Sequence, residues 1–275
     1  MQLDAFDYLK PRCPLTGGKE FYGGNPEQQC GSIPVEAVIE KLDGYLNREQ
    51  YEPANRLLYY WLEEARALKD RQGELSILSE IMGLSRRRND RQGGLQAVKR
   101  GFALLEELKL QSKAAGTIWL NGATTLKAFG NAEESVAYYE KAYENLDQYL
   151  PKEDPLWGGF FNNYALALAD LDRFKEAEHL YFQAIAVMEK QENGGLEIAV
   201  TLLNLAETYE RAGEPESKIE KALEQAQEYL DDTHLVRNGY YAFVCRKCAP
   251  TFGHFGWFLL QRELNERADR IYAGT

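Results

Sequence analysis

A segment with one asparagine inside an apolar pattern occurs three times in the chain. The copies read WLNGATTLKAFG (119–130), FNNYALALADLD (161–172) and LLNLAETYERAG (202–213). Asn121, Asn163 and Asn204 are separated by 42 and then 41 residues, and each stands two positions before an alanine. The apolar residues around them follow the period of an amphipathic helix. A helix that returns at this interval restricts the chain to a repeat architecture.

Each copy is followed by a second stretch with helical periodicity. These stretches are AEESVAYYEKAYENL (132–146), FKEAEHLYFQAIAVMEK (174–190) and PESKIEKALEQAQEYL (215–230). The repeating unit is therefore a pair of helices. Because the chain has no Val- and Ile-rich alternating stretch typical of strands, we expect an all-α fold.

The second stretches resemble the tetratricopeptide repeat (TPR), with its small, aromatic and small positions. Ser135, Tyr139 and Ala142 fit these positions in one copy, and the next copy has Ala177, Tyr181 and Ala184. A period near 42 residues, rather than the ordinary repeat of about 34, is more similar to kinesin light chain and to bacterial peptide-sensing regulators. The resemblance implies a right-handed α-solenoid that binds a protein or peptide segment in its concave groove.

Six copies of the repeat fit the chain when this register is extended outward. Ala54, Ala97 and Ala268 are expected at the small position of the first, second and last copies. Lys218 takes that position in the fifth copy, so the final spacing, from Lys218 to Ala268, stretches to 50 residues. In this register Gly101 takes the aromatic position of the second copy. We therefore expect a domain of about six repeats over 33–275, after an irregular segment at 1–32 that is rich in Gly and Pro.

The asparagines allow two interpretations. In the families that the chain resembles, such asparagines hold the backbone of the ligand, which implies the same role for Asn121, Asn163 and Asn204. Alternatively, each carboxamide bonds the neighbouring helix and only fixes the stacking of repeats. The residues expected to border the groove beside them are Asn162, Lys127, Glu207, Glu210 and Arg211, with His254 at the matching place in the last repeat and Trp257 as an aromatic anchor.

The charge of the chain disfavours nucleic acid as a partner, because a net charge of −11 repels phosphate. The basic stretch formed by Arg86, Arg87, Arg88 and Arg91 is expected to place favourable charge at the end of a helix; the alternative is a local contact with an anion or acidic peptide. The chain lacks an apolar stretch of about 18 residues and begins with acidic residues, so we expect no membrane association and a cytoplasmic location.

The four cysteines leave three interpretations open. Cys245 and Cys248 form a CRKC motif, but one such motif supplies at most half of a zinc site, and Cys13 and Cys30 lie far away in sequence. A redox role would need a lowered thiol pKa. Reduced thiols packed between helices are the favoured interpretation, so we expect no cofactor and no metal.

These patterns favour a non-enzymatic scaffold that binds a protein or peptide segment. The sequence has no phosphate-binding glycine loop and no HExxH or G-x-S-x-G motif. One alternative is a peptide-responsive regulatory subunit that acts through a partner protein. A second is a zinc- or redox-linked assembly that uses Cys245 and Cys248, and a homo-oligomer stays open.

Overall fold

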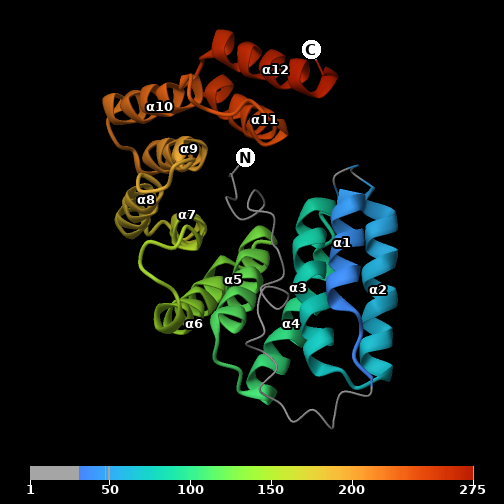
Figure 1. Ribbon diagram of the computed structural model, residues 1–275. Helices are drawn as coiled ribbons and strands as arrows, with labels where there is room; N and C mark the ends of the chain where they lie inside the picture. The colour runs from blue at the N-terminus through green and yellow to red at the C-terminus, as the bar shows by residue number, and fades with distance from the viewer. Residues whose placement is uncertain (1–30, 47, 49, 275) are drawn as a thin grey trace. The chain divides into compact units, whose positions relative to one another are not determined.

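The computed structural model describes residues 31–46, 48 and 50–274, and this part of the chain is helical without strands (Figure 1). It divides into two compact units with a boundary between residues 150 and 151. The N-terminal unit contains α1 (Val35–Leu46), α2 (Tyr51–Ala67), α3 (Arg71–Arg88), α4 (Arg91–Leu108), α5 (Lys113–Ala128) and α6 (Ala132–Tyr149). The C-terminal unit contains α7 (Leu156–Asp170), α8 (Phe174–Met188), α9 (Gly195–Ala212), α10 (Glu216–Asp231), α11 (Gly239–His254) and α12 (Phe258–Ala273).

The helices form six consecutive pairs in the described part of the chain. Each odd-numbered helix, called a first helix, packs against the even-numbered second helix that follows it. Within each unit, neighbouring first helices also contact one another: α1 with α3 and α3 with α5, then α7 with α9 and α9 with α11. This arrangement confirms the all-α prediction and the repeating helix pair.

The same four residues, DRQG, stand at the start of two helices of the N-terminal unit. In each, the aspartate precedes the helix and its carboxylate accepts a hydrogen bond from the backbone N–H of the glycine: Gly73 to Asp70 and Gly93 to Asp90, both at 2.9 Å. Such caps satisfy backbone donors that a helix start leaves without an intrahelical partner. The repeated tetrapeptide therefore fixes where α3 and α4 begin.

The second helices of the last four repeats share one register. Ala142, Ala184, Ala226 and Ala268 are each 42 residues apart and fully buried. Ala268 therefore stands at the second small position of the repeat, not at the first as expected. The spacing of 50 residues at the end of the chain was wrong, because the sequence match used the wrong one of two small positions.

The register of α4 also differs from the prediction. A Cβ atom added to Gly94 would lie 2.5 Å from Phe129 and one added to Gly101 would lie 2.8 Å from Met82. Both glycines therefore stand where a neighbouring side chain approaches the helix closely, so they are the small positions of this repeat. Val98, between them, takes the aromatic position, and the register based on Ala97 was wrong by three residues.

Residues 1–30, which include Cys13, Cys30 and most of the expected irregular segment, lie outside the described residues. Among the helices that are described, none has the length and apolar character needed to cross a membrane.

Candidate functional site

The asparagines of the C-terminal unit lie between first helices. The Asn204 side-chain N–H donates to Oδ1 of Asn162 at 3.0 Å, and Asn162 in turn donates to Oδ1 of Asn163 at 3.1 Å. All three side chains are buried, with at most 1% of their surface exposed. Asn162 therefore supplies the carboxamide that bonds α7 to α9, and Asn163 bonds Asn162 within α7.

The asparagine of the N-terminal unit has the same position between two first helices. Asn121 on α5 donates to the backbone oxygen of Ser79 on α3 at 2.8 Å and also to its hydroxyl at 3.0 Å. Arg86 donates to Oδ1 of Asn121 and to the hydroxyl of Thr125, both at 2.7 Å. In both units the structure places the carboxamides at stacking contacts rather than on an exposed surface.

A set of polar residues in the C-terminal unit lies one to two turns further along the same helices, with Asp172 just after the end of α7; Thr251 is buried and the others are half-buried or exposed. Thr251 donates to Glu207 at 2.9 Å, and the His254 ring lies 2.7 Å from a carboxylate oxygen of Glu210. Arg211 donates to the carbonyl oxygen of Ala169 at 2.7 Å and reaches two carboxylates at 3.3 Å. We call this set the polar row: Asp170, Asp172, Glu207, Glu210, Arg211, Thr251 and His254.

Apart from Thr251, which is 3% exposed, the polar row is accessible to solvent, unlike the buried asparagines. The side chains of His254 and Glu210 are 55% and 47% exposed. Their pairing joins α9 to α11, and the Arg211 contacts join α7 to α9. Glu207, Arg211 and His254, which the sequence singled out, are thus brought together in one row, whereas Thr251, Asp170 and Asp172 were missed because no spacing rule marks them.

Two further residues that the sequence singled out are not part of the polar row. Trp257 precedes α12 and is half-buried, with its ring centroid 5.7 Å from that of Phe252. Lys127 belongs to the last turn of α5 in the N-terminal unit and is also half-buried. Trp257 therefore contributes to packing at the start of the last helix.

The basic stretch at the end of α3 is divided among several partners. Arg86 reaches across to α5, as described above, and Arg88 pairs with Glu52 on α2 at 2.6 Å. Contrary to the prediction, Arg91 does not belong to this helix end, because it begins α4; it donates to Asn131 at 3.1 Å. These bonds link helices, so the stretch does more than place positive charge at a helix end.

The solved structures reported below, which are similar in fold to this chain, are repeat proteins. The chain matches a kinesin-light-chain-like protein of nearly identical TPR-like repeats from Podosopora anserina at 18% identity and a TM-score of 0.51, covering 72% of this chain and 94% of that one. A variant of that protein gives a TM-score of 0.52 at 18% identity, covering 72% and 93%. BtubC (BKLC) from P. vanneervenii is 19% identical, with a TM-score of 0.49 and 88% and 92% coverage. The chain has a TPR-like fold.

Comparison of the sequence with family models and with curated proteins gives no significant match. The structural matches confirm the resemblance to TPR repeats of the kinesin light chain type at the level of the fold. This likeness concerns the fold alone, and the chemistry of any site must come from its own residues.

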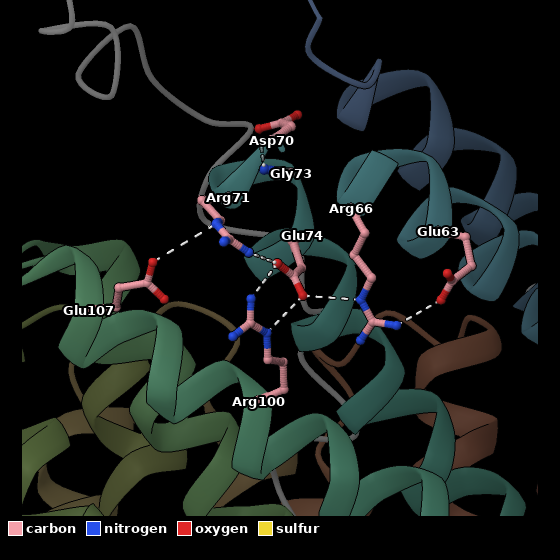
Figure 2. Close-up of polar contacts among 8 residues, drawn as sticks. All are labelled: Glu63, Arg66, Asp70, Arg71, Gly73, Glu74, Arg100 and Glu107. Atoms are coloured by element: carbon pink, nitrogen blue, oxygen red, sulfur yellow. Dashed lines mark hydrogen bonds and ion pairs between the residues drawn. The ribbon is translucent and has the colours of Figure 1, made fainter. Parts of the chain in front are cut away.

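The N-terminal unit of this TPR-like fold is joined by an ionic cluster around Glu74, shown in Figure 2. The carboxylate is 1% exposed and accepts hydrogen bonds from Arg100 on α4 at 2.9 Å, and from Arg66 and Arg71 at 3.2 Å. Burial alone would raise the pKa of Glu74, but the bonds from the three guanidinium groups outweigh it and hold the pKa at about 2. All three arginines are occupied, so the cluster ties α2, α3 and α4 together.

A second buried carboxyl on α3 has the opposite environment. Glu80 is 7% exposed. Burial raises the pKa of Glu80 to about 8, the nearby Asp43 carboxylate adds to the rise, and Arg87 and Arg86 oppose it. Glu80 is therefore held as the neutral acid at pH 7.

The thiols of Cys245 and Cys248 are fully buried in α11. Burial raises the pKa of both thiols, so the thiolate needed for redox chemistry or zinc binding is disfavoured. In the described ranges, no group of three or more His, Cys, Asp and Glu side chains has an arrangement that could hold a metal ion. The environment of this pair matches packed, reduced thiols.

Proposed function

We propose that the chain is a non-enzymatic scaffold that binds a protein or peptide segment across its first helices. In the C-terminal unit the contact surface is the polar row. The observation that supports this proposal is a difference in burial along α7, α9 and α11: buried carboxamides align the helices, and the exposed charged or polar side chains of Glu210, Arg211 and His254 stand beside them.

Energetics favour the polar row as the exchangeable layer. Exposed ion pairs contribute about 0–1 kcal/mol each, so ligand groups can replace the Arg211–Asp172 contact at small cost. The exposed His254–Glu210 hydrogen bond can be replaced in the same way. The buried Asn204–Asn162 bond is different, because breaking it leaves buried polar groups without partners. The ligand therefore exchanges partners with the row while the helix stack stays intact.

The chemistry of the row fits a polypeptide better than a single charged group. It offers carboxylates, a guanidinium and an imidazole, which together donate to and accept from main-chain groups and bind side chains of either charge. Asn121, Asn163 and Asn204 are buried, so they contact the ligand backbone only if ligand binding exposes their side chains.

A displayed random peptide library, selected on the wild-type chain, tests the proposal. The dissociation constants of selected peptides are compared for the wild type, a triple variant with Glu210→Ala, Arg211→Ala and His254→Ala, and a control triple with Lys175→Ala, Glu224→Ala and Gln225→Ala on α8 and α10. We expect affinity to fall about tenfold or more, about 1.4 kcal/mol, in the first triple only. Equal affinities for all three proteins would show that the polar row does not bind the peptides.

An Asn204→Ala variant separates the role of the asparagine from that of the row. If peptide affinity falls while the melting temperature stays unchanged, Asn204 contacts the ligand. A fall in melting temperature without loss of affinity in the folded protein assigns Asn204 to stacking.

A further inference from the structure

One stripe of α8 packs onto the repeat that follows it. Tyr209 donates to Glu178 at 2.6 Å, Thr208 donates to Tyr181 at 3.4 Å, and the Arg211 guanidinium lies 5.6 Å from the centre of the Phe174 ring. Ile185 and Met188, at the end of the same stripe, join the core cluster of the C-terminal unit. The spacing of these five residues is i, i+4, i+7, i+11 and i+14, which places them on one side of a helix.

The same stripe on α12 has no following repeat in the described part of the chain. Adding 84 residues, two repeats, to the α8 positions gives Phe258, Arg262, Asn265, Asp269 and Tyr272. Phe258 is 68% exposed and Tyr272 is 51% exposed, whereas Tyr181 and Met188 on α8 are buried. Arg262 and Asp269 have side chains that are 73% and 66% exposed. The stacking face of the last repeat is therefore accessible along its whole length.

The residue types of this stripe are symmetric about its centre. From either end the order is aromatic, charged, asparagine, charged, aromatic, and the two charged residues, Arg262 and Asp269, are of opposite sign. Two copies of α12 in antiparallel orientation would place Phe258 against the partner's Tyr272 and Arg262 against the partner's Asp269. Asn265 would face the partner's Asn265 on the axis, where a carboxamide can both donate and accept.

Contacts within the chain already hold one end of the stripe in place. Arg246 on α11 pairs with Asp269 at 2.6 Å and lies 4.6 Å from the centre of the Tyr272 ring. Both side chains keep more than half of their surface exposed. The stripe is thus a pre-ordered surface, which reduces the entropy lost on association.

We propose that α12 is the contact surface for a second copy of this chain, in a two-fold dimer in which the two last helices pack antiparallel around Asn265. A two-fold interface requires a self-complementary patch, and the stripe meets that requirement in both its apolar and its charged positions. A polar centre also selects against apolar partners, as a polar residue does at a coiled-coil core position. The interface is a single helix from each copy, so we expect a dissociation constant in the micromolar range, about 1–100 µM. This dimer is independent of peptide binding by the polar row.

Charge exchange provides the first test, by sedimentation equilibrium over a concentration series. Arg262→Asp places two carboxylates face to face twice in the dimer, and Asp269→Arg places two guanidinium groups face to face. We expect each single variant to weaken the dimer at least tenfold. The double variant, with Arg262→Asp and Asp269→Arg, restores opposite charges across the dimer; it is combined with Arg246→Asp, because Arg246 pairs with Asp269 within the chain, and should recover most of the affinity. Circular dichroism of each variant verifies that it is folded.

Cross-linking provides the second test, in a background with Cys13→Ser and Cys30→Ser. Asn265→Cys puts one thiol on the two-fold axis, so mild oxidation should give a covalent dimer. A control, Gln225→Cys on the exposed side of α10, should not. A wild-type chain that stays monomeric at its highest soluble concentration overturns the proposal. So does a dimer that survives both single charge reversals, because it must use another surface.

Discussion

The buried polar links of the two units differ in chemistry. In the N-terminal unit they include charged groups: three arginines converge on Glu74 and join α2, α3 and α4, and Arg86 bonds Asn121 and Thr125 beside the neutral Asn121–Ser79 bond. In the C-terminal unit the buried links of the asparagines are neutral, as is Thr208–Tyr181. Charged groups occur there in the polar row and in pairs such as Arg267–Asp231.

This difference shows that the TPR-like framework specifies where a polar link is needed and leaves its chemistry open. The same ladder position holds Ser79, Asn121, Asn162 and Asn204 in successive first helices. An ionic link is stronger but depends on pH, whereas an amide link has the same charge at every pH. The two units should therefore respond differently to mutation and to acid.

Removing the Glu74 carboxylate should have the largest effect. Glu74→Gln leaves three guanidinium groups around a neutral amide, and we expect the N-terminal unit to lose about 3 kcal/mol of unfolding free energy at pH 7. Urea unfolding followed by tryptophan fluorescence measures this loss, in a background with Trp157→Phe and Trp257→Phe so that Trp61 and Trp119 report on the N-terminal unit alone.

The same variant has a defined pH dependence. The pKa of Glu74 is about 2 in the folded protein and near 4.5 when unfolded, so its contribution is complete above pH 4.5 and is lost as the pH falls towards 2. The difference between wild type and Glu74→Gln should shrink over that interval. Glu63→Gln, which removes an exposed partner of Arg66, is the control and should cost less than 1 kcal/mol. A constant difference across the pH range would show that the cluster does not act through ionisation.

The next effect compares the two asparagine links. Asn121→Ala removes two bonds to Ser79 and one to Arg86, and should destabilise the N-terminal unit by about 2–3 kcal/mol. Asn204→Ala should cost the C-terminal unit about 1–2 kcal/mol, because its partner Asn162 is another neutral amide. Urea midpoints measure both losses. If the Asn204→Ala variant loses more stability than Asn121→Ala, the ranking of ionic over neutral links is wrong.

Glu80 should give an effect of opposite sign. Its folded pKa of about 8 lies above the unfolded value, so ionisation of the unfolded chain destabilises the fold progressively from pH 4.5 to pH 8. Glu80→Gln should therefore be more stable than wild type by about 2 kcal/mol at pH 8 and equal to it at pH 4. Melting temperatures at several pH values provide the measurement, and a variant less stable than wild type at pH 8 contradicts this assignment.

The smallest effect is expected at the start of α11. Tyr240 donates to Glu197 on α9 at 2.6 Å, and this bond counteracts the rise in the Glu197 pKa that burial causes. Tyr240→Phe should cost about 1 kcal/mol and raise the Glu197 pKa further. Urea unfolding and titration of the carboxyl by NMR measure the two changes; Tyr229→Phe is the matched control.

The sequence was sufficient for the helix pair, its period and the fold, because apolar spacing along one helix depends on residues close in sequence. The sequence was less reliable where two residues of the same type could each be assigned to one position of the repeat. Ala97 and Ala268 were assigned to the wrong small position because alanine also occurs elsewhere on the buried side of a helix. Asn163 was chosen over Asn162 for the same reason, although the carboxamide that bonds Asn204 is one residue earlier.

The Glu74 cluster could not be predicted, because its residues come from three helices and have no common spacing. The partners of the polar row, Thr251 and Asp170, were missed for the same reason. The burial of the asparagines depends on how closely two first helices approach, which is a property of packing rather than of the sequence of either helix.

Bonds between first helices also explain why the repeats need not have equal length. The pairs Asn121–Ser79 and Asn204–Asn162 are 42 residues apart, whereas Thr251–Glu207 and His254–Glu210 are 44 apart. One extra residue lies in α10, which has 16 residues against 15 in α8. The other lies between α10 and α11: compared with residues 189–194 between α8 and α9, the connection 232–238 is one residue longer. This connection is therefore a natural site for inserting an epitope or a fluorescent tag, since the chain there can grow outward while the stack keeps its alignment.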